Sequence, residues 1–223
     1  MEAYKKRIDE CTDLESLFAL WQEAQKNEEN YELTFPGKGT LPIEFRNNWT
    51  DDGYLSDNKD DIDILFILKE PNEQSTIDKE DEKVFGYKEF WIKNNINNFR
   101  CAIPRRMYKA TRKLVSEDLT KETWIKKAAV MNLNKRGGYS QTDPTQLLNY
   151  VKTYKAFICK EIEIINPKII VFLCGVNNDT KNIIDELNLS DKYCVFYSYH
   201  PSYKGKHNSF KDNCFLESIK SIK

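Results

Sequence analysis

Two side chains with catalytic potential directly follow apolar stretches of this sequence. Glu70 stands before a proline, and His200 begins the tripeptide His200-Pro201-Ser202. A proline restricts the preceding residue to extended backbone, so the Glu70 carboxylate could point into a cleft and activate a water molecule. The imidazole of His200 has an ordinary pKa near neutral pH and could act as a hydrogen-bond donor or general acid. Taken alone, Glu70 is better explained as a solvated loop acid and His200 as a structural histidine.

Two asparagines follow another apolar stretch. Asn132 and Asn134 carry amide groups that both donate and accept hydrogen bonds, which is what reading the Watson–Crick edge of a nucleobase requires. In an extended strand these two side chains lie on the same side, with Leu133 opposite. Either amide could instead satisfy the backbone of a loop.

Basic residues gather in three clusters, although the net charge of the chain is −1. A net charge near zero argues against broad affinity for polyanions, but it leaves a local basic surface possible. Each cluster alone could equally be an ordinary solvated surface. The clusters are Arg105 and Arg106 with Lys109, Arg112 and Lys113; Lys135 and Arg136; and Lys204 and Lys206.

Four short apolar runs are expected to form the strands that position these groups: 62–68, 128–133, 169–174 and 193–199. Apolar strands that alternate with helices are typical of a parallel sheet covered on both faces. Ligands of such sheets bind beyond the carboxyl ends of the strands. The sequence therefore predicts that Glu70, Asn132, Gly175 and His200 converge at one edge of the sheet.

Helices are expected on both sides of these strands. Apolar residues recur at helical spacing after Thr12 and through Ala24, behind a capping box. The further helices predicted are one opened by Asp143-Pro144 and ended by Pro167, one from Pro104 through Leu114, and one capped by Ser209 that runs through Cys214 and Ile219. Residues 31–61 are rich in turn-forming residues and predict an irregular connector.

Length and composition favour one large domain with an appendage. We expect residues 1–60 to form an N-terminal helix and connector, and residues 61–223 to form the main α/β domain. The chain has no apolar run long enough to span a bilayer and no apolar signal-peptide region, so we expect no membrane contact and a cytoplasmic location. Its six cysteines form no Cys-x-x-Cys pair, so we expect no metal and no cofactor.

Taken together, the order of these motifs resembles the uracil-DNA glycosylase superfamily from about residue 62 to the C-terminus. Four segments carry the resemblance. Leu68-Lys69-Glu70-Pro71-Asn72 is similar to the motif whose water-orienting residue precedes a proline, and residues 130–136 are similar to the strand with the base-contacting asparagine. Residues 167–175 are similar to the third strand and its phosphate-contacting glycine, and His200-Pro201-Ser202 is similar to the second catalytic motif.

The resemblance implies a three-layer α/β/α fold with a central four-stranded parallel sheet, and a monomeric, monofunctional DNA glycosylase. It implies that Glu70 orients water and that His200 stabilises the departing base. The remaining roles are base binding by Asn132, Phe85, Pro71 and Asn72, and DNA binding by Gly175, Ser202, Tyr203, Lys204, Lys135 and Arg136. Leu68 and Glu70 differ from the residues usual in the family, so the target base stays open between uracil and a modified pyrimidine.

Two other readings remain. A relative of the same fold could bind nucleic acid or a protein partner without catalysis. A nucleotide-dependent α/β enzyme is disfavoured, because neither Gly-x-Gly-x-x-Gly nor a Walker A loop follows any predicted strand.

Overall fold

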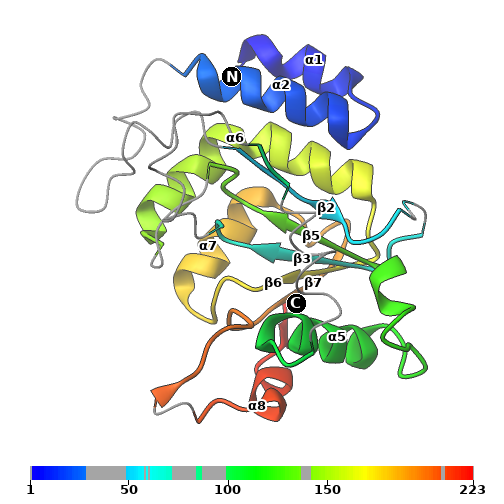
Figure 1. Cartoon of the computed structure of the whole chain (residues 1–223). Coiled ribbons are helices and arrows are strands. Elements are labelled where there is room, and N and C mark those ends of the chain that lie inside the picture. The colour runs from blue at the N-terminus through cyan, green and yellow to red at the C-terminus, as the bar shows by residue number, and fades with distance from the viewer. Residues whose placement is uncertain are drawn as a thin grey trace. The chain divides into compact units, whose positions relative to one another are not determined.

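The computed structural model describes residues 2–28, 49–57, 59, 61–71, 84–86, 99–136, 142–206 and 209–222 (Figure 1). The chain forms two compact units, each assembled from separate stretches. The first unit combines Met1–Asp51, Lys69–Gly86 and Asn132–Ile164, and the second combines Asp52–Leu68, Tyr87–Met131 and Ile165–Lys223. Within the described ranges, no helix has the length and apolar character needed to cross a membrane.

The main sheet contains six strands in the order β2-β5-β3-β6-β7-β8. Their bounds are β2 Gly53–Tyr54, β3 Ile64–Leu68, β5 Ala128–Asn132, β6 Ile169–Phe172, β7 Cys194–Tyr197 and β8 Lys220–Ser221. Strand β6 pairs in parallel with both β3 and β7. The four predicted apolar runs thus form β3, β5, β6 and β7, and the α/β fold class is confirmed.

The expectation of a purely parallel, four-stranded sheet is not confirmed, because the sheet is mixed. Strand β2 runs antiparallel to β5, and β8 runs antiparallel to β7. Both added strands are two residues long and lie at the edges of the sheet. Short edge strands of this kind cover the backbone groups that an outer parallel strand would leave unpaired.

One face of the sheet packs against helices of the second unit. Ile64, Phe66 and Leu68 alternate along β3 and so point to the same face of the sheet, and every residue of this strand is buried. With them in one apolar cluster lie Val130, Val171, Met107, Ala110, Trp124 and Phe215. The last four come from α5 (Ala102–Leu114), the 3-10 turn η4 (Trp124–Lys126) and α8 (Asp212–Glu217), so these elements cover this face. In Figure 1, α5 and α8 lie side by side below the sheet.

Two predicted helix starts in the second unit need correction. Helix α5 begins at Ala102, so Pro104 is its third residue, still within the first turn where a backbone N–H has no partner in the helix. Helix α8 begins at Asp212, and its N-cap is Lys211, which makes no side-chain capping bond. Ser209 therefore does not cap it. The second unit also contains α7 (Asn178–Leu187), capped by Asn177, which accepts a hydrogen bond from Thr180 N–H.

The first unit is built on two helices. Helix α2 (Leu14–Lys26) starts after Asp13, whose carboxylate accepts from Ser16 N–H, so the cap lies one residue beyond the predicted Thr12. Helix α6 (Pro144–Ile165) starts as predicted, with Asp143 accepting from Gln146 N–H. The buried Trp21 indole of α2 packs against the rings of Tyr150, Tyr154 and Phe157 of α6. Shorter elements here are η1 Glu2–Tyr4, α1 Lys5–Glu10, and the parallel strands β1 Trp49–Asp51 and β4 Val84–Gly86.

Candidate functional site

Glu70 lies two residues beyond the end of β3 and is held by Asn134 of the first unit. The Asn134 side-chain amide donates to Glu70 Oε2 at 3.1 Å, and Asn134 N–H donates to the Lys69 carbonyl at 2.9 Å. Asn134 is buried, whereas Glu70 keeps part of its surface accessible. The structure thus joins a predicted catalytic acid to one of the two predicted amides.

Burial raises the pKa of the Glu70 carboxyl to about 7. Hydrogen bonds with Thr142 and Asn134, and the charge of Lys69, favour the ionised form but do not cancel the loss of hydration. A carboxyl group that titrates near neutral pH can both accept and release a proton under physiological conditions. Such a group is a candidate general base, because catalytic acids and bases are usually found among strongly perturbed residues in partly accessible positions.

The Asn134 amide is itself fixed from its other end. Its Oδ1 accepts the backbone N–H of Arg136 at 3.0 Å, so the NH2 group must face Glu70. The Arg136 guanidinium, fully buried, donates to the carboxylate of Glu28, to the hydroxyl of Tyr154 at 3.0 Å and to the Gln25 carbonyl at 3.3 Å. The segment after β5 is therefore anchored to the C-terminal end of α2.

Lys135 provides a second anchor for the same segment. Its ammonium group pairs with Glu161 of α6 at 2.8 Å, and both side chains have an exposed fraction of 0%. Its backbone N–H donates to the Tyr150 hydroxyl at 3.3 Å, and that hydroxyl donates to Gln25 Oε1 at 2.6 Å. Burial raises the pKa of the Tyr150 phenol, which therefore stays protonated and remains a donor.

These contacts correct the expectation that Lys135 and Arg136 bind DNA. Both side chains are completely buried and paired with carboxylates inside the first unit, so neither can reach a phosphate. Glu161 was missed by sequence reasoning, although it carries a signal. It lies on the apolar stripe of its helix, three residues after Ile158, and a charge in that position predicts a buried partner.

The predicted base-binding residues have mixed outcomes. Asn132 ends β5 and is fully buried. Pro71, the residue after Glu70, is also buried. Asn72 lies outside the described residues. For Phe85 only the backbone is described, in β4, where it pairs with Thr50.

His200 and Ser202 form a tight turn after β7 in the second unit. Ser202 N–H donates to His200 Nδ1 at 3.2 Å, and the Ser202 hydroxyl lies 2.6 Å from the same nitrogen. Because a backbone N–H can only donate, Nδ1 must accept, and the neutral ring then carries its proton on Nε2. The turn thus selects the tautomer in which Nε2 is a hydrogen-bond donor.

The other residues predicted to hold DNA in this unit are accessible. Ser202, Tyr203 and Lys204 are exposed, and Gly175 is half-buried. Gly175 has φ of +124°, a backbone conformation that side chains disfavour, and its N–H donates to the Ser198 carbonyl at 3.0 Å. A residue with a side chain would be strained at position 175, which explains why a glycine is found there.

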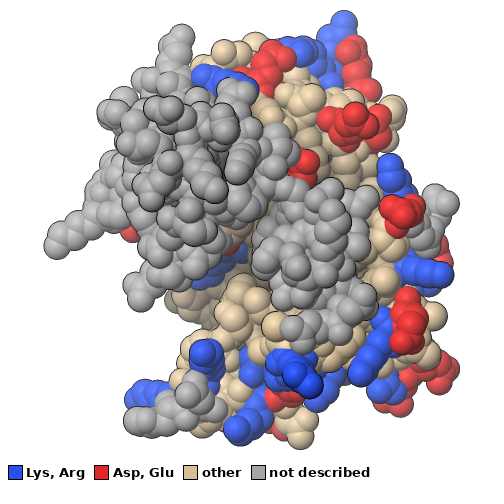
Figure 2. Space-filling view, viewed as in Figure 1, with Lys and Arg blue, Asp and Glu red and all other residues tan. Residues whose placement is uncertain are grey.

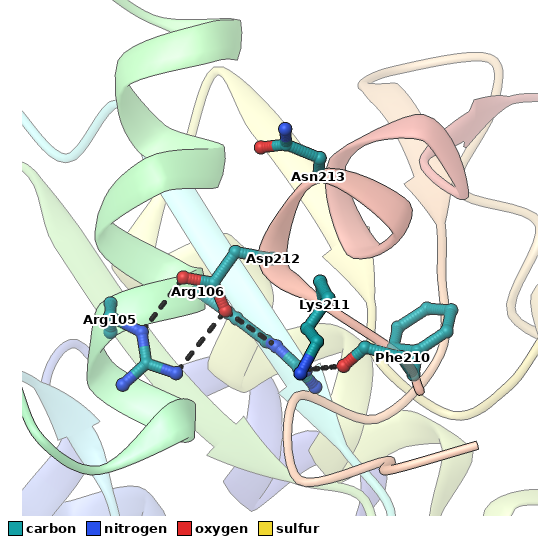
Figure 3. Close-up of a pocket in the computed structure, with 6 residues that line it drawn as sticks. All are labelled: Arg105, Arg106, Phe210, Lys211, Asp212 and Asn213. Atoms are coloured by element: carbon teal, nitrogen blue, oxygen red, sulfur yellow. Dashed lines mark hydrogen bonds and ion pairs between the residues drawn. The ribbon is translucent and has the colours of Figure 1, made fainter. Parts of the chain in front are cut away.

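A buried arginine that sequence analysis treated only as part of a basic cluster holds the His200 turn. Arg106, with an exposed fraction of 5%, donates to the carbonyls of Pro201 at 2.8 Å and Tyr203 at 2.7 Å. It also donates to the Phe210 carbonyl and to Asp212. One guanidinium thus ties α5 to the segment that carries His200, and Figure 3 shows its bonds to Phe210 and Asp212.

Within the described part of the chain, no three His, Cys, Asp or Glu side chains gather as a metal site would require. Comparison of the sequence with protein-family models and with curated proteins found no match.

The buried Lys135–Glu161 pair yields a stability prediction. Glu161→Gln leaves a buried ammonium without its counter-charge and should lower the free energy of unfolding by about 3–5 kcal/mol in urea denaturation. Lys135→Met combined with Glu161→Leu removes both charges and should cost much less. Equal losses in the single and double variants would contradict a charge-pairing role.

The raised pKa of Glu70 yields a pH prediction. A carboxyl that binds its proton more tightly when folded stabilises the protein at low pH, and this contribution is lost as pH rises from about 4.5 to about 7. Glu70→Gln should therefore gain stability relative to the unsubstituted protein across that interval, and the difference should level off above it. Urea denaturation at several pH values measures it, and a constant difference would show that the pKa is not raised.

Proposed function

We propose that this protein is a base-excising DNA glycosylase, related to the uracil-DNA glycosylase superfamily, that removes uracil or a modified pyrimidine. The observation that carries the proposal is the Glu70 carboxyl, partly accessible, oriented by Asn134 and with its pKa raised to about 7. The motif order of the sequence supplies the reaction class. The proposed fold includes the three-layer arrangement around four parallel strands that this superfamily has.

In the proposed mechanism, ionised Glu70 orients a water molecule for attack on the anomeric carbon. Its negative charge also favours the oxocarbenium-like sugar that forms as the N-glycosidic bond breaks. Asn134 keeps the carboxylate in one orientation during this step. Because the carboxyl loses its proton near neutral pH, it can then accept a proton from the attacking water.

The departing base leaves with the electron pair of the broken bond, and a hydrogen-bond donor is needed to stabilise its negative charge. His200 is proposed for this role, because the neutral tautomer set by Ser202 presents Nε2–H as a donor. Asn132 is proposed to read the edge of the extruded base, as the family resemblance implies. Gly175, Ser202, Tyr203 and Lys204 are the proposed contacts to the DNA backbone.

The activity test uses end-labelled DNA strands that contain uracil, mismatched bases or modified pyrimidines, followed by alkali to cleave abasic sites. The protein should cleave one of them, and Glu70→Gln and His200→Ala should each lower the single-turnover rate roughly 10²–10³-fold. Glu163→Gln, which changes an exposed carboxylate of α6, is the matched control and should retain activity. The rate should rise with pH around an apparent pKa near 7.

Retention of full activity by both variants would overturn the residue assignments. Absence of cleavage on every substrate, together with intact DNA binding, would favour a non-catalytic nucleic-acid-binding protein.

A further inference from the structure

Two segments of the second unit hold an unusual excess of positive charge. Residues 99–116 and 199–216 together contain nine lysines and arginines and one carboxylate, Asp212, which gives them a net charge of +8 in a chain whose total is −1. An ordinary solvated surface mixes charges of both signs. A concentration of one sign destabilises the folded state by self-repulsion and attracts polyanions.

The two segments form one surface because Asp212 joins them. Its carboxylate accepts hydrogen bonds from Arg105 at 2.8 Å, Arg106 at 3.2 Å and Lys109 at 2.9 Å, all from α5. Figure 3 draws the bonds from Arg105 and Arg106. Burial favours the protonated acid, but hydrogen bonds from these three cations outweigh it and hold the pKa of Asp212 well below its usual range. One carboxylate cannot neutralise three cations, so the cluster keeps a net positive charge.

The surface around this cluster is open. A cavity of about 550 Å³ lies beside it, lined by Arg105, Arg106, Phe210, Lys211, Asp212 and Asn213. The same two segments carry further cations with exposed side chains: Arg100, Arg112, Lys113, Lys204, Lys206 and Lys211. Figure 2 shows lysine and arginine side chains along the lower part of the molecule, over α5, α8 and the segment after β7. This arrangement differs from that of Lys135 and Arg136, whose charges are buried.

We propose that α5 and residues 199–206 and 209–213 form a single surface that binds the phosphate backbone of a nucleic-acid strand. This inference rests on the proposed function for its partner, and it extends the contact well beyond Ser202, Tyr203 and Lys204. Lysine and arginine side chains that neutralise phosphates release condensed counterions, so binding must weaken with salt. The surface supplies this sequence-independent affinity.

The test compares two triple variants that remove the same charge from different places. Lys113→Gln, Lys206→Gln and Lys211→Gln are combined in the surface variant, and Lys5→Gln, Lys6→Gln and Lys152→Gln, all exposed in the first unit, form the control. The probe is a fluorescent 20-nucleotide single-stranded DNA of mixed sequence. Fluorescence anisotropy gives Kd between about 50 and 200 mM NaCl, the range over which phosphate contacts change affinity most, and circular dichroism checks folding.

The surface variant should bind at least about 10-fold more weakly at 100 mM salt, and its slope of log Kd against log salt should fall by about two, since each lost single-strand phosphate contact removes roughly 0.7. The control should bind like the unsubstituted protein. Equal weakening of both variants, or no salt-dependent binding by the unsubstituted protein, would overturn the proposal. Glu70→Gln should bind normally. Absence of excision by the unsubstituted protein on every substrate, with its salt-dependent binding retained, would count against the glycosylase mechanism alone.

Discussion

Two buried cations set the geometry of the first unit. An ammonium or guanidinium group removed from water costs several kcal/mol unless a carboxylate and further hydrogen bonds replace its hydration. Lys135 and Arg136 meet this requirement through Glu161 of α6 and Glu28, which lies two residues after the end of α2. These two anchors leave the backbone of residues 134–136 little freedom, and the position of Asn134 is fixed as a result. The N-terminal helices are thus part of the framework that orients a candidate catalytic residue.

Two carboxyl groups show how surroundings decide proton affinity. Asp212 receives hydrogen bonds from three cations, which hold its pKa low in spite of burial. Glu70 is also largely removed from water, but its direct hydrogen-bond partners are the neutral groups of Asn134 and Thr142, so its pKa rises to about 7. The carboxyl that the sequence motif singled out is thus the one with its pKa near neutrality.

The second unit uses a similar device for a different purpose. Arg106 satisfies its buried charge with Asp212 and with the carbonyls of Pro201, Tyr203 and Phe210, which lie within and after the His200 turn. A loop held by a guanidinium in this way already has one conformation, so little conformational entropy is lost when a ligand binds to it. The neighbouring cations face solvent, and the charge excess that they create is what makes the surface suited to a polyanion.

The sequence alone determined the elements whose signal is local. Apolar runs located β3, β5, β6 and β7, and the Asp143-Pro144 cap located the start of α6. It also placed the proline after Glu70 and the serine that accompanies His200. Only the tertiary structure decided what depends on distant partners. Edge strands two residues long, such as β2, have no periodic pattern, and their direction is set by the strand they join. The burial of Arg136 depends on Glu28, 108 residues away in the sequence, so the same basic residues that suggested a DNA contact became internal supports.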